Sequence, residues 1–167
     1  MASELRVDKI IPTGGVPSDS VSGNTTFFGA GGVIQVVSSI ETGAVSTTST
    51  SFINSGQNCV ITPKFSTSKI LVLFNCANYN NGDDGHTYFT IYRDSTNLGH
   101  STEGFTLASC GDNGRGRWNH CSMHILDNPA TTSAVTYKIY FRKGTAGTSY
   151  MRLNDSHRSF MTVMEVS

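Results

Sequence analysis

The longest apolar run in the chain is Ile70 to Phe74, within the segment KILVLFNC at residues 69–76. It is far shorter than a membrane-spanning helix, which needs about 20 apolar residues. A short run rich in Val, Ile, Leu and Phe is typical of a strand that is apolar on both faces. We therefore expect a central β-strand here, with both of its faces covered.

The segments around this run have the two-residue period of strands, and none has a helical period. In residues 86–93, for example, Phe89 and Ile91 share one face while tyrosines and a threonine share the other. Turns rich in Gly, Asn and Asp separate the segments. Eight to ten short strands of this kind predict an all-β fold, an antiparallel jelly-roll-like sandwich whose strand order stays open. The other expected strands lie at residues 33–37, 51–53, 59–62, 118–127, 135–141, 150–153 and 160–166.

The first 32 residues differ in character from the rest of the chain. The pattern of SELRVDKIIP at residues 3–12 is extended, and a linker rich in Gly, Ser and Pro follows it. This part has too little apolar surface to fold alone, so we expect it to gain order from another chain. We divide the chain into an anchoring segment with its linker at 1–32 and a β-sandwich domain at 33–167. The apolar side chains expected to dock are Leu5, Val7, Ile10 and Ile11.

The charge balance argues against two classes of partner. Lys and Arg together number 12, Asp and Glu together number 12, and charged residues make up only 14% of the chain. A surface that binds nucleic acid or an acidic membrane needs an excess of positive charge. The charged N-terminus also has no apolar core of the kind that a secretory signal needs. The sequence therefore predicts no nucleic-acid partner and no membrane insertion.

The histidines and cysteines form no metal-binding motif. His120 and His124 are four residues apart, which on a strand is about 13 Å and too far for one ion. Copies of them could still meet on the symmetry axis of an oligomer. The Asp- and Asn-rich turns at 80–85 and 111–116 lack the distal glutamate of a calcium loop. We expect no metal and no cofactor, and buried thiols at the four cysteines, which have no CxxC spacing: Cys59, Cys76, Cys110 and Cys121.

Catalytic motifs are also missing from the sequence. Gly-x-Ser-x-Gly does not occur, and the four glutamates offer no obvious pair of carboxylates. Cys110 and His120 could form a dyad, but no motif around them supports one. The sequence therefore predicts that the chain is not an enzyme, with a hydrolase as a remote alternative.

Two polar loops are the candidates for contact with a ligand or receptor. They span residues 78–86 and 109–118, and recognition usually lies on the loops of a rigid sandwich. Arg and Trp are typical of binding hot spots, and the tyrosines of the chain, Tyr150 among them, could stack on sugars. Alternatively, the loops only close the sheets, or Trp118 packs between subunits. The candidate contact residues are Tyr79, Asp83, Asp84, Arg115, Arg117 and Trp118.

Five segments, spread in order over nearly the whole chain, carry a resemblance to known proteins. They are SELRVDKIIPTGG (3–15), GGVIQVV (31–37), ETGAVSTTSTSFIN (41–54), ITPKFSTSKILVLFN (61–75) and SFMTVMEVS (159–167). In this order they resemble a family of small virion proteins of tailed phages, notably phages that infect cyanobacteria and other marine bacteria. The specific motifs are those at 3–15 and 31–75, whereas residues 78–130 carry none.

The resemblance implies a tail fibre or related virion attachment protein, usually a homotrimer, whose jelly-roll-like domain faces the host. Its implied partners are other tail or capsid proteins, bound through the N-terminal segment, and a host surface glycan or protein. Such a protein is part of the virion and is assembled in the host cytoplasm. The chain has no heptads and no long fibrous repeat, so a capsid decoration (cement) protein remains an alternative. A carbohydrate-binding module is the alternative from a different class.

Overall fold

The computed structural model describes residues 32–82, 85–109, 117–152 and 157–167. These residues form no helix, and so include none that is long and apolar enough to cross a membrane. They form eleven strands, three of them with three residues or fewer. The strands are β1 (Val33–Glu41), β2 (Val45–Thr47), β3 (Ile53–Ile61), β4 (Lys69–Asn80), β5 (His86–Arg93), β6 (Thr96–Asn97), β7 (Thr106–Ser109), β8 (Arg117–Asp127), β9 (Val135–Lys143), β10 (Ser149–Met151) and β11 (Ser159–Val166).

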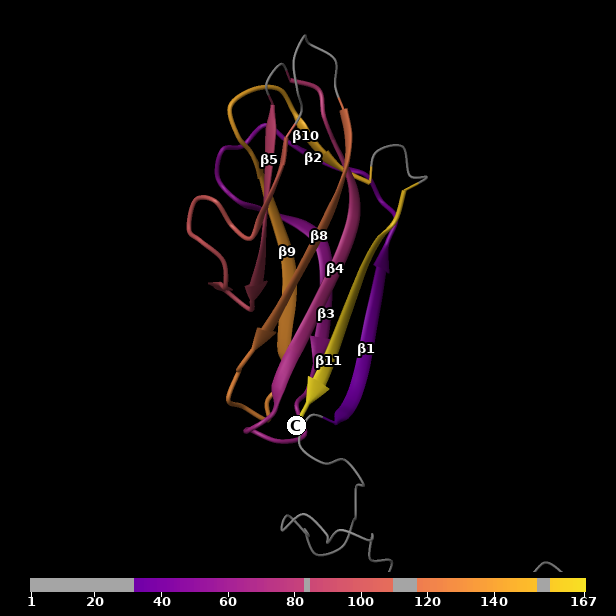
Figure 1. Ribbon diagram of the computed structural model, residues 1–167, viewed down its shortest axis with the longest axis vertical. Helices are drawn as coiled ribbons and strands as arrows, with labels where there is room; N and C mark the ends of the chain where they lie inside the picture. The colour runs from indigo at the N-terminus through magenta and orange to yellow at the C-terminus, as the bar shows by residue number, and fades with distance from the viewer. Residues whose placement is uncertain (1–31, 83–84, 110–116, 153–156) are drawn as a thin grey trace, which may run out of the picture.

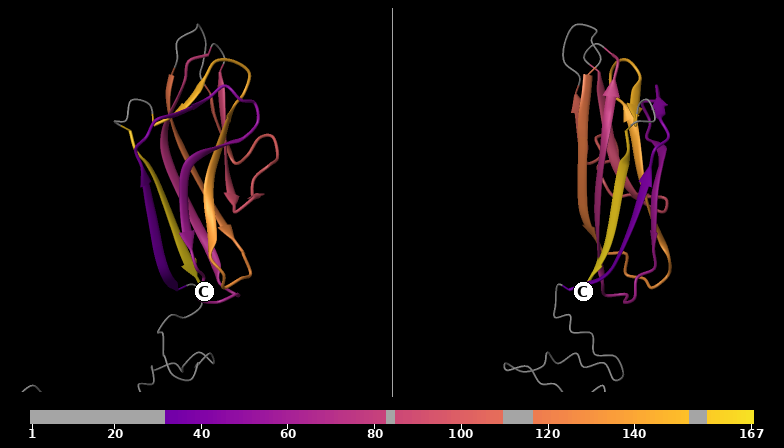
Figure 2. Two further views of the ribbon diagram at one scale, coloured as in Figure 1. Left: turned by 180° about the vertical axis from the view of Figure 1, so that it is seen from behind. Right: turned by 90° about the vertical axis from the view of Figure 1, so that its right-hand side faces the viewer.

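The strands form two antiparallel sheets that pack face to face (Figures 1 and 2). The six-stranded sheet has the order β1-β11-β4-β10-β2, with β8 on the other side of β4. The five-stranded sheet has the order β3-β9-β5-β6, with β7 also pairing with β5. The all-β antiparallel sandwich predicted from the sequence is thus confirmed. Most connections between the long strands cross from one sheet to the other, which is compatible with the expected jelly-roll-like arrangement.

The core lies between the sheets, where the inward face of each long strand is apolar. On β9, the inward residues Val135, Tyr137, Ile139 and Phe141 are all buried, as their spacing predicts. Phe89 and Ile91 on β5, and Cys121 and Met123 on β8, are buried in the same core. These faces agree with the sequence because a two-residue period places alternate side chains on opposite sides of a strand.

The expectation that both faces of β4 are covered is wrong for a single copy of the chain. The strand is central, since β8 lies on one side of it and β11 and β10 lie on the other. Ile70, Val72 and Phe74 on its inward face are fully buried, but Leu71 and Leu73 on its outward face are only half-buried. The outward face is incompletely covered because the chain has only two layers, and both sides of a strand are covered only where a third layer packs on the sheet.

The two ends of the sandwich carry different parts of the chain, the termini of the sandwich at one end and two strand connections at the other. Val33 is paired with Val166, and the amide of Ser167 donates to the carbonyl of Gly32. The connection to residues 1–31 and the C-terminus therefore lie at the same end (Figure 1). The connections β4–β5 and β9–β10 meet at the opposite end, where Asn81 and Thr148 exchange two hydrogen bonds. We call this opposite end the loop end.

Buried polar groups between the sheets hold the loop end together. Asn80 Nδ2 donates to Ser149 Oγ at 3.0 Å, and the amide of Gly82 donates to Asn80 Oδ1 at 2.8 Å. The buried Arg152 donates to the carbonyls of Gly43 and Ser55 at 2.6 and 2.7 Å. Burial lowers the pKa of its guanidinium. The loops at this end therefore rest on a network of internal hydrogen bonds.

Candidate functional site

An aromatic cluster lies on the outward face of the six-stranded sheet, near the loop end. Tyr79 on β4 is directly opposite Trp118 on β8 and Tyr150 on β10. Its ring centroid lies 5.3 Å from that of Trp118 and 5.8 Å from that of Tyr150. The ring of His157 lies 4.6 Å from that of Trp118, whose side chain stays 47% exposed. The cluster thus offers several adjacent rings, the kind of surface that stacks against sugars or other rings.

The structure brings together two of the six candidate contact residues, Tyr79 and Trp118. The backbone of Arg117 belongs to β8, where it is paired with Asn80. Three of the candidates lie outside the described residues: Asp83, Asp84 and Arg115. The sequence predicts Tyr150 only as one of the rings that could stack on sugars, and it does not predict a site at His157. His157 follows Trp118 by 39 residues with no strand register between them, so no sequence pattern could have joined the two.

The anchoring residues Leu5, Val7, Ile10 and Ile11 also lie outside the described residues. Their role in docking therefore stays a prediction. The structure bears on it only through the strand that follows, since β1 starts at Val33 beside the C-terminus.

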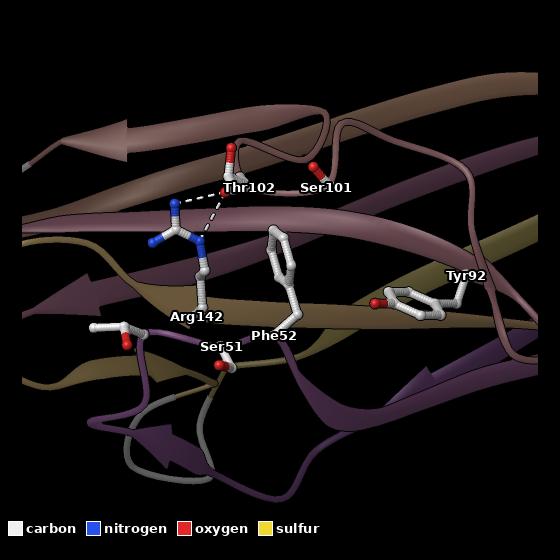
Figure 3. A pocket seen from close by; sticks show the side chains of 7 residues that line it. Ser51, Phe52, Tyr92, Ser101, Thr102 and Arg142 are labelled. Carbon is white, nitrogen blue, oxygen red and sulfur yellow. Dashed lines mark hydrogen bonds between the residues drawn. The ribbon is translucent and has the colours of Figure 1, made fainter.

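A second candidate site is a pocket on the outward face of the five-stranded sheet (Figure 3). Its volume is about 430 Å³, within the range of small-ligand sites. Phe52 lies between Arg142 and Tyr92 and forms part of the wall with them. The rest of the lining carries hydroxyl groups, from Thr50, Ser51, Ser101 and Thr102.

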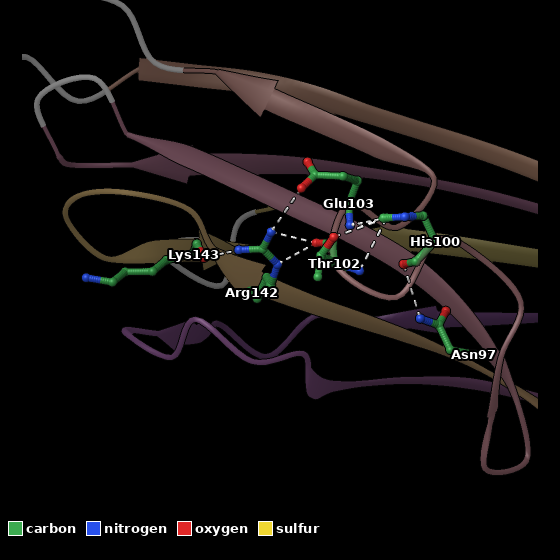
Figure 4. A network of polar contacts seen from close by, with 6 residues as sticks. All are labelled: Asn97, His100, Thr102, Glu103, Arg142 and Lys143. Carbon is green, nitrogen blue, oxygen red and sulfur yellow. Dashed lines mark hydrogen bonds and ion pairs between the residues drawn. The ribbon is translucent and has the colours of Figure 1, made fainter.

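Arg142 fixes one wall of this pocket. Its Nε and Nη2 atoms donate to the carbonyl oxygen of Thr102 at 2.8 and 2.5 Å (Figure 4). Its guanidinium carbon lies 4.0 Å from the centroid of the Tyr88 ring. The Glu103 carboxylate lies 3.8 Å from Nη2, and the amide of Glu103 donates to Nδ1 of His100. The β6–β7 connection is thus tied to the sheet by the contacts of Arg142.

Tyr92 adds a stacked pair of rings to the pocket. Its centroid lies 4.0 Å from that of Tyr140, with 24° between the ring planes. The sequence predicts that Tyr92 could be a stacking ring, but no pattern in it predicts the pocket. Its lining comes from four segments separated by up to about ninety residues, which only the fold brings together.

The described residues contain no group of three or more His, Cys, Asp or Glu side chains that could hold a metal ion. His120 and His124 both lie exposed on the outward face of β8. Cys59, Cys76 and Cys121 are buried and unpaired, as expected for thiols in a core. A hydrogen bond with Cys76, together with burial, raises the pKa of Cys121. Cys110 lies outside the described residues.

Comparison with known proteins adds no relative. No family model matches the chain, and no curated protein is significantly similar to it.

Proposed function

We propose that this chain is a structural protein of a tailed-phage virion, a short tail fibre that docks through its N-terminal segment and presents the sandwich for host attachment. The motifs at residues 3–15 and 31–75, which resemble small virion proteins of tailed phages, are one support for this proposal. The resemblance also implies a homotrimer, and the missing catalytic motifs in the sequence argue against enzymatic activity.

The observation that carries the proposal is the separation of the two ends of the sandwich. Residues 1–31 join β1 next to the C-terminus, while Tyr79, Trp118 and Tyr150 lie toward the loop end. A sandwich anchored through its N-terminus would therefore hold the aromatic cluster away from the particle. Recognition residues on a rigid scaffold need this separation from the anchor.

The location is tested by cryo-electron microscopy of the parent virion. The sandwich is expected at the tail, with the end that holds Val33 and Val166 toward the particle. Density for the sandwich on the capsid shell would replace this proposal with a capsid decoration protein. Absence of the chain from purified virions would overturn both.

The anchor is tested by deleting residues 1–17, which lie outside the described residues. The shortened chain is expected to keep its melting temperature and to be missing from virions. Full burial of each apolar side chain contributes about 1.5–3 kcal/mol, so losing Leu5, Val7, Ile10 and Ile11 together removes much of the docking energy. Normal incorporation of the shortened chain would place the anchor elsewhere.

Recognition through the aromatic cluster is tested by the Trp118→Ala substitution. Phe65→Ala is the matched control, because Phe65 is 49% exposed and Trp118 is 47% exposed. Loss of host-cell adsorption by Trp118→Ala alone, at an unchanged melting temperature, supports recognition. A large drop in melting temperature would mean that Trp118 packs the fold, and unchanged adsorption would remove it from the receptor site.

The pocket beside Arg142 favours a second candidate function, a carbohydrate-binding module. Aromatic rings stack on the apolar faces of sugars, and hydroxyl groups exchange hydrogen bonds with them. A glycan-binding screen with the purified chain tests this candidate. A hit that is lost in Tyr92→Ala but kept in Trp118→Ala would assign binding to the pocket, and the reverse result would assign it to the aromatic cluster.

A further inference from the structure

The outward face of the six-stranded sheet has an unusual composition. One row across it consists of Val36, Met164, Leu71 and Leu126, which lie opposite one another on β1, β11, β4 and β8. The next row is Ser38, Thr162, Leu73 and His124, and the row after that is Ile40, Phe160, Asn75 and Ser122. The three rows contain no Asp, Glu, Lys or Arg. We call this set of twelve residues the apolar face.

The exposure of the apolar face is high for such residues. Val36, Ile40, Leu126 and Phe160 are 55%, 53%, 52% and 48% exposed. No described segment crosses in front of β11, β4 and β8 in Figure 1, which looks onto this sheet. Seven of the twelve residues are apolar, and apolar side chains that a folded chain leaves exposed together mark an interaction surface.

The outward face of the five-stranded sheet, by contrast, carries charged residues and is partly covered. Lys138 and Arg142 lie on it, opposite Tyr92 and Tyr88. β6 and the connection that follows it cover part of this face, since Thr90 is fully buried there, donates to Asn97 and lies against Gly99. The uncovered, uncharged surface is thus a property of the six-stranded sheet and not of the chain in general.

We propose that the apolar face is the surface through which copies of this chain associate with one another. The run at residues 69–76 has the pattern of a strand with both faces covered, and the chain itself covers only one. A second copy would cover the other face, burying Leu71 and Leu73. His120 and His124, which are exposed on the same side of β8, would then lie in or beside the interface.

The face has the size of the apolar core of an interface. Four strands spaced by about 4.8 Å, and the five residues along each strand at about 3.3 Å each, give a planar area of roughly 300 Å². Stable interfaces bury about 800 Å² per partner and surround an apolar core with a polar rim, so the residues around the face would supply the remaining area. Copies also meet without electrostatic repulsion here, because the face is uncharged and the whole chain has a net charge of zero.

The test introduces one charge into the apolar face by Leu126→Asp. Val60→Asp is the matched control, because Val60 is 49% exposed on the outward side of β3 in the other sheet. Light scattering after size-exclusion chromatography at micromolar concentration measures the mass of the full chain. The unsubstituted chain and Val60→Asp are expected to run at the same multiple of 17.9 kDa, and Leu126→Asp at 17.9 kDa. An unpaired buried charge raises the dissociation constant about 100-fold or more.

Ser122→Glu is a second variant in case Leu126→Asp does not fold. Ser122 is exposed on the edge strand β8, so a longer side chain does not disturb the core. This variant is expected to keep its melting temperature and to lose the assembly mass. A monomeric unsubstituted chain, including one whose own residues 1–31 cover the face, would overturn the proposal. So would an assembly that survives Ser122→Glu and Leu126→Asp, or one that Val60→Asp disrupts equally. The purified chain is used throughout, so the result does not depend on a role in the virion.

Discussion

The phenol of Tyr137 donates a 2.7 Å hydrogen bond to Oδ2 of Asp127, and the two residues belong to opposite sheets. Asp127 also accepts two hydrogen bonds from Nη1 of Arg93, at 3.0 and 2.9 Å. Tyr137 is fully buried, so its polar atom needs a partner. The pair therefore joins the two layers near one edge of the core.

Tyr137→Phe removes this bond and leaves Asp127 paired with Arg93. We expect the free energy of unfolding to fall by about 1–3 kcal/mol, the cost of losing a buried hydrogen bond to a charged group. Urea denaturation at neutral pH measures it. Tyr150→Phe is the control, because Tyr150 lies on the outward face of β10, and it should change stability much less.

The same tyrosine predicts a loss of stability at alkaline pH. Burial, and the hydrogen bond to Asp127, raise the pKa of Tyr137 above its ordinary value. Its contribution to stability is therefore complete below the unfolded-state pKa of about 10, and it is lost as the pH rises above that value. Between about pH 9 and about pH 11, the free energy of unfolding should fall more steeply with pH for the unsubstituted chain than for Tyr137→Phe. An equal pH dependence of the free energy of unfolding in the two chains would contradict the prediction.

Glu165 predicts a loss of stability at acid pH. The side chain is fully buried at the end that carries the C-terminus, where it accepts hydrogen bonds from Gln35 Nε2 at 2.6 Å and from the amide of Lys64 at 2.8 Å. Burial alone would raise the pKa of this carboxyl, but the hydrogen bonds outweigh burial and lower it. The stabilisation is therefore present above the unfolded-state pKa of about 4.3 and is lost as the pH falls below it.

Glu165→Gln tests this account. The substitution replaces a charged acceptor by an amide, and we expect the free energy of unfolding at neutral pH to fall by about 2 kcal/mol. It should also reduce the acid sensitivity of the melting temperature. Glu103→Gln is the control, because the side chain of Glu103 is 58% exposed. Equal effects of the two substitutions would show that Glu165 has no special role.

Gly147 predicts a strict requirement for glycine at the loop end. Its φ is +74°, and a Cβ there would collide with the backbone of Gly82. Gly147→Ala should destabilise the fold by about 2 kcal/mol or more, from backbone strain and steric overlap. Gly43→Ala is the control, because a Cβ at Gly43 meets nothing within 4 Å. Melting temperatures of the two variants measure the difference in stability. Similar values would mean that the loop end rearranges to accommodate the added Cβ.

Arg142→Lys should loosen the β6–β7 connection. Lysine keeps the charge but cannot make both hydrogen bonds to Thr102 or stack as a plane on Tyr88. We expect faster hydrogen exchange at the amides of residues 99–105 and unchanged exchange on β4. Arg158→Lys, at an exposed position, should leave both regions unchanged. Unchanged exchange at 99–105 in Arg142→Lys would show that other contacts hold this connection.

The sequence alone determined the fold class and most of the inward faces. The alternation in β5, β8 and β9 is local, because consecutive side chains of a strand point to opposite sides whatever its neighbours are. Tyr137, Ile139 and Phe141 could therefore be assigned to one face from their spacing. Tyr79 and Trp118 were both selected as contact residues, but nothing in their spacing placed them opposite each other.

Only the tertiary structure decided which residues of distant segments lie beside one another. The contacts of Tyr79 with Trp118 and Tyr150 depend on strand order and register, which arise from contacts between distant segments. The pocket beside Arg142 has the same origin, because residues 50–52, 92, 101–102 and 142 meet only in the folded five-stranded sheet. The half-covered Leu71 and Leu73 depend on the number of layers, because a local pattern records that a face is apolar but not whether the same chain or another copy covers it.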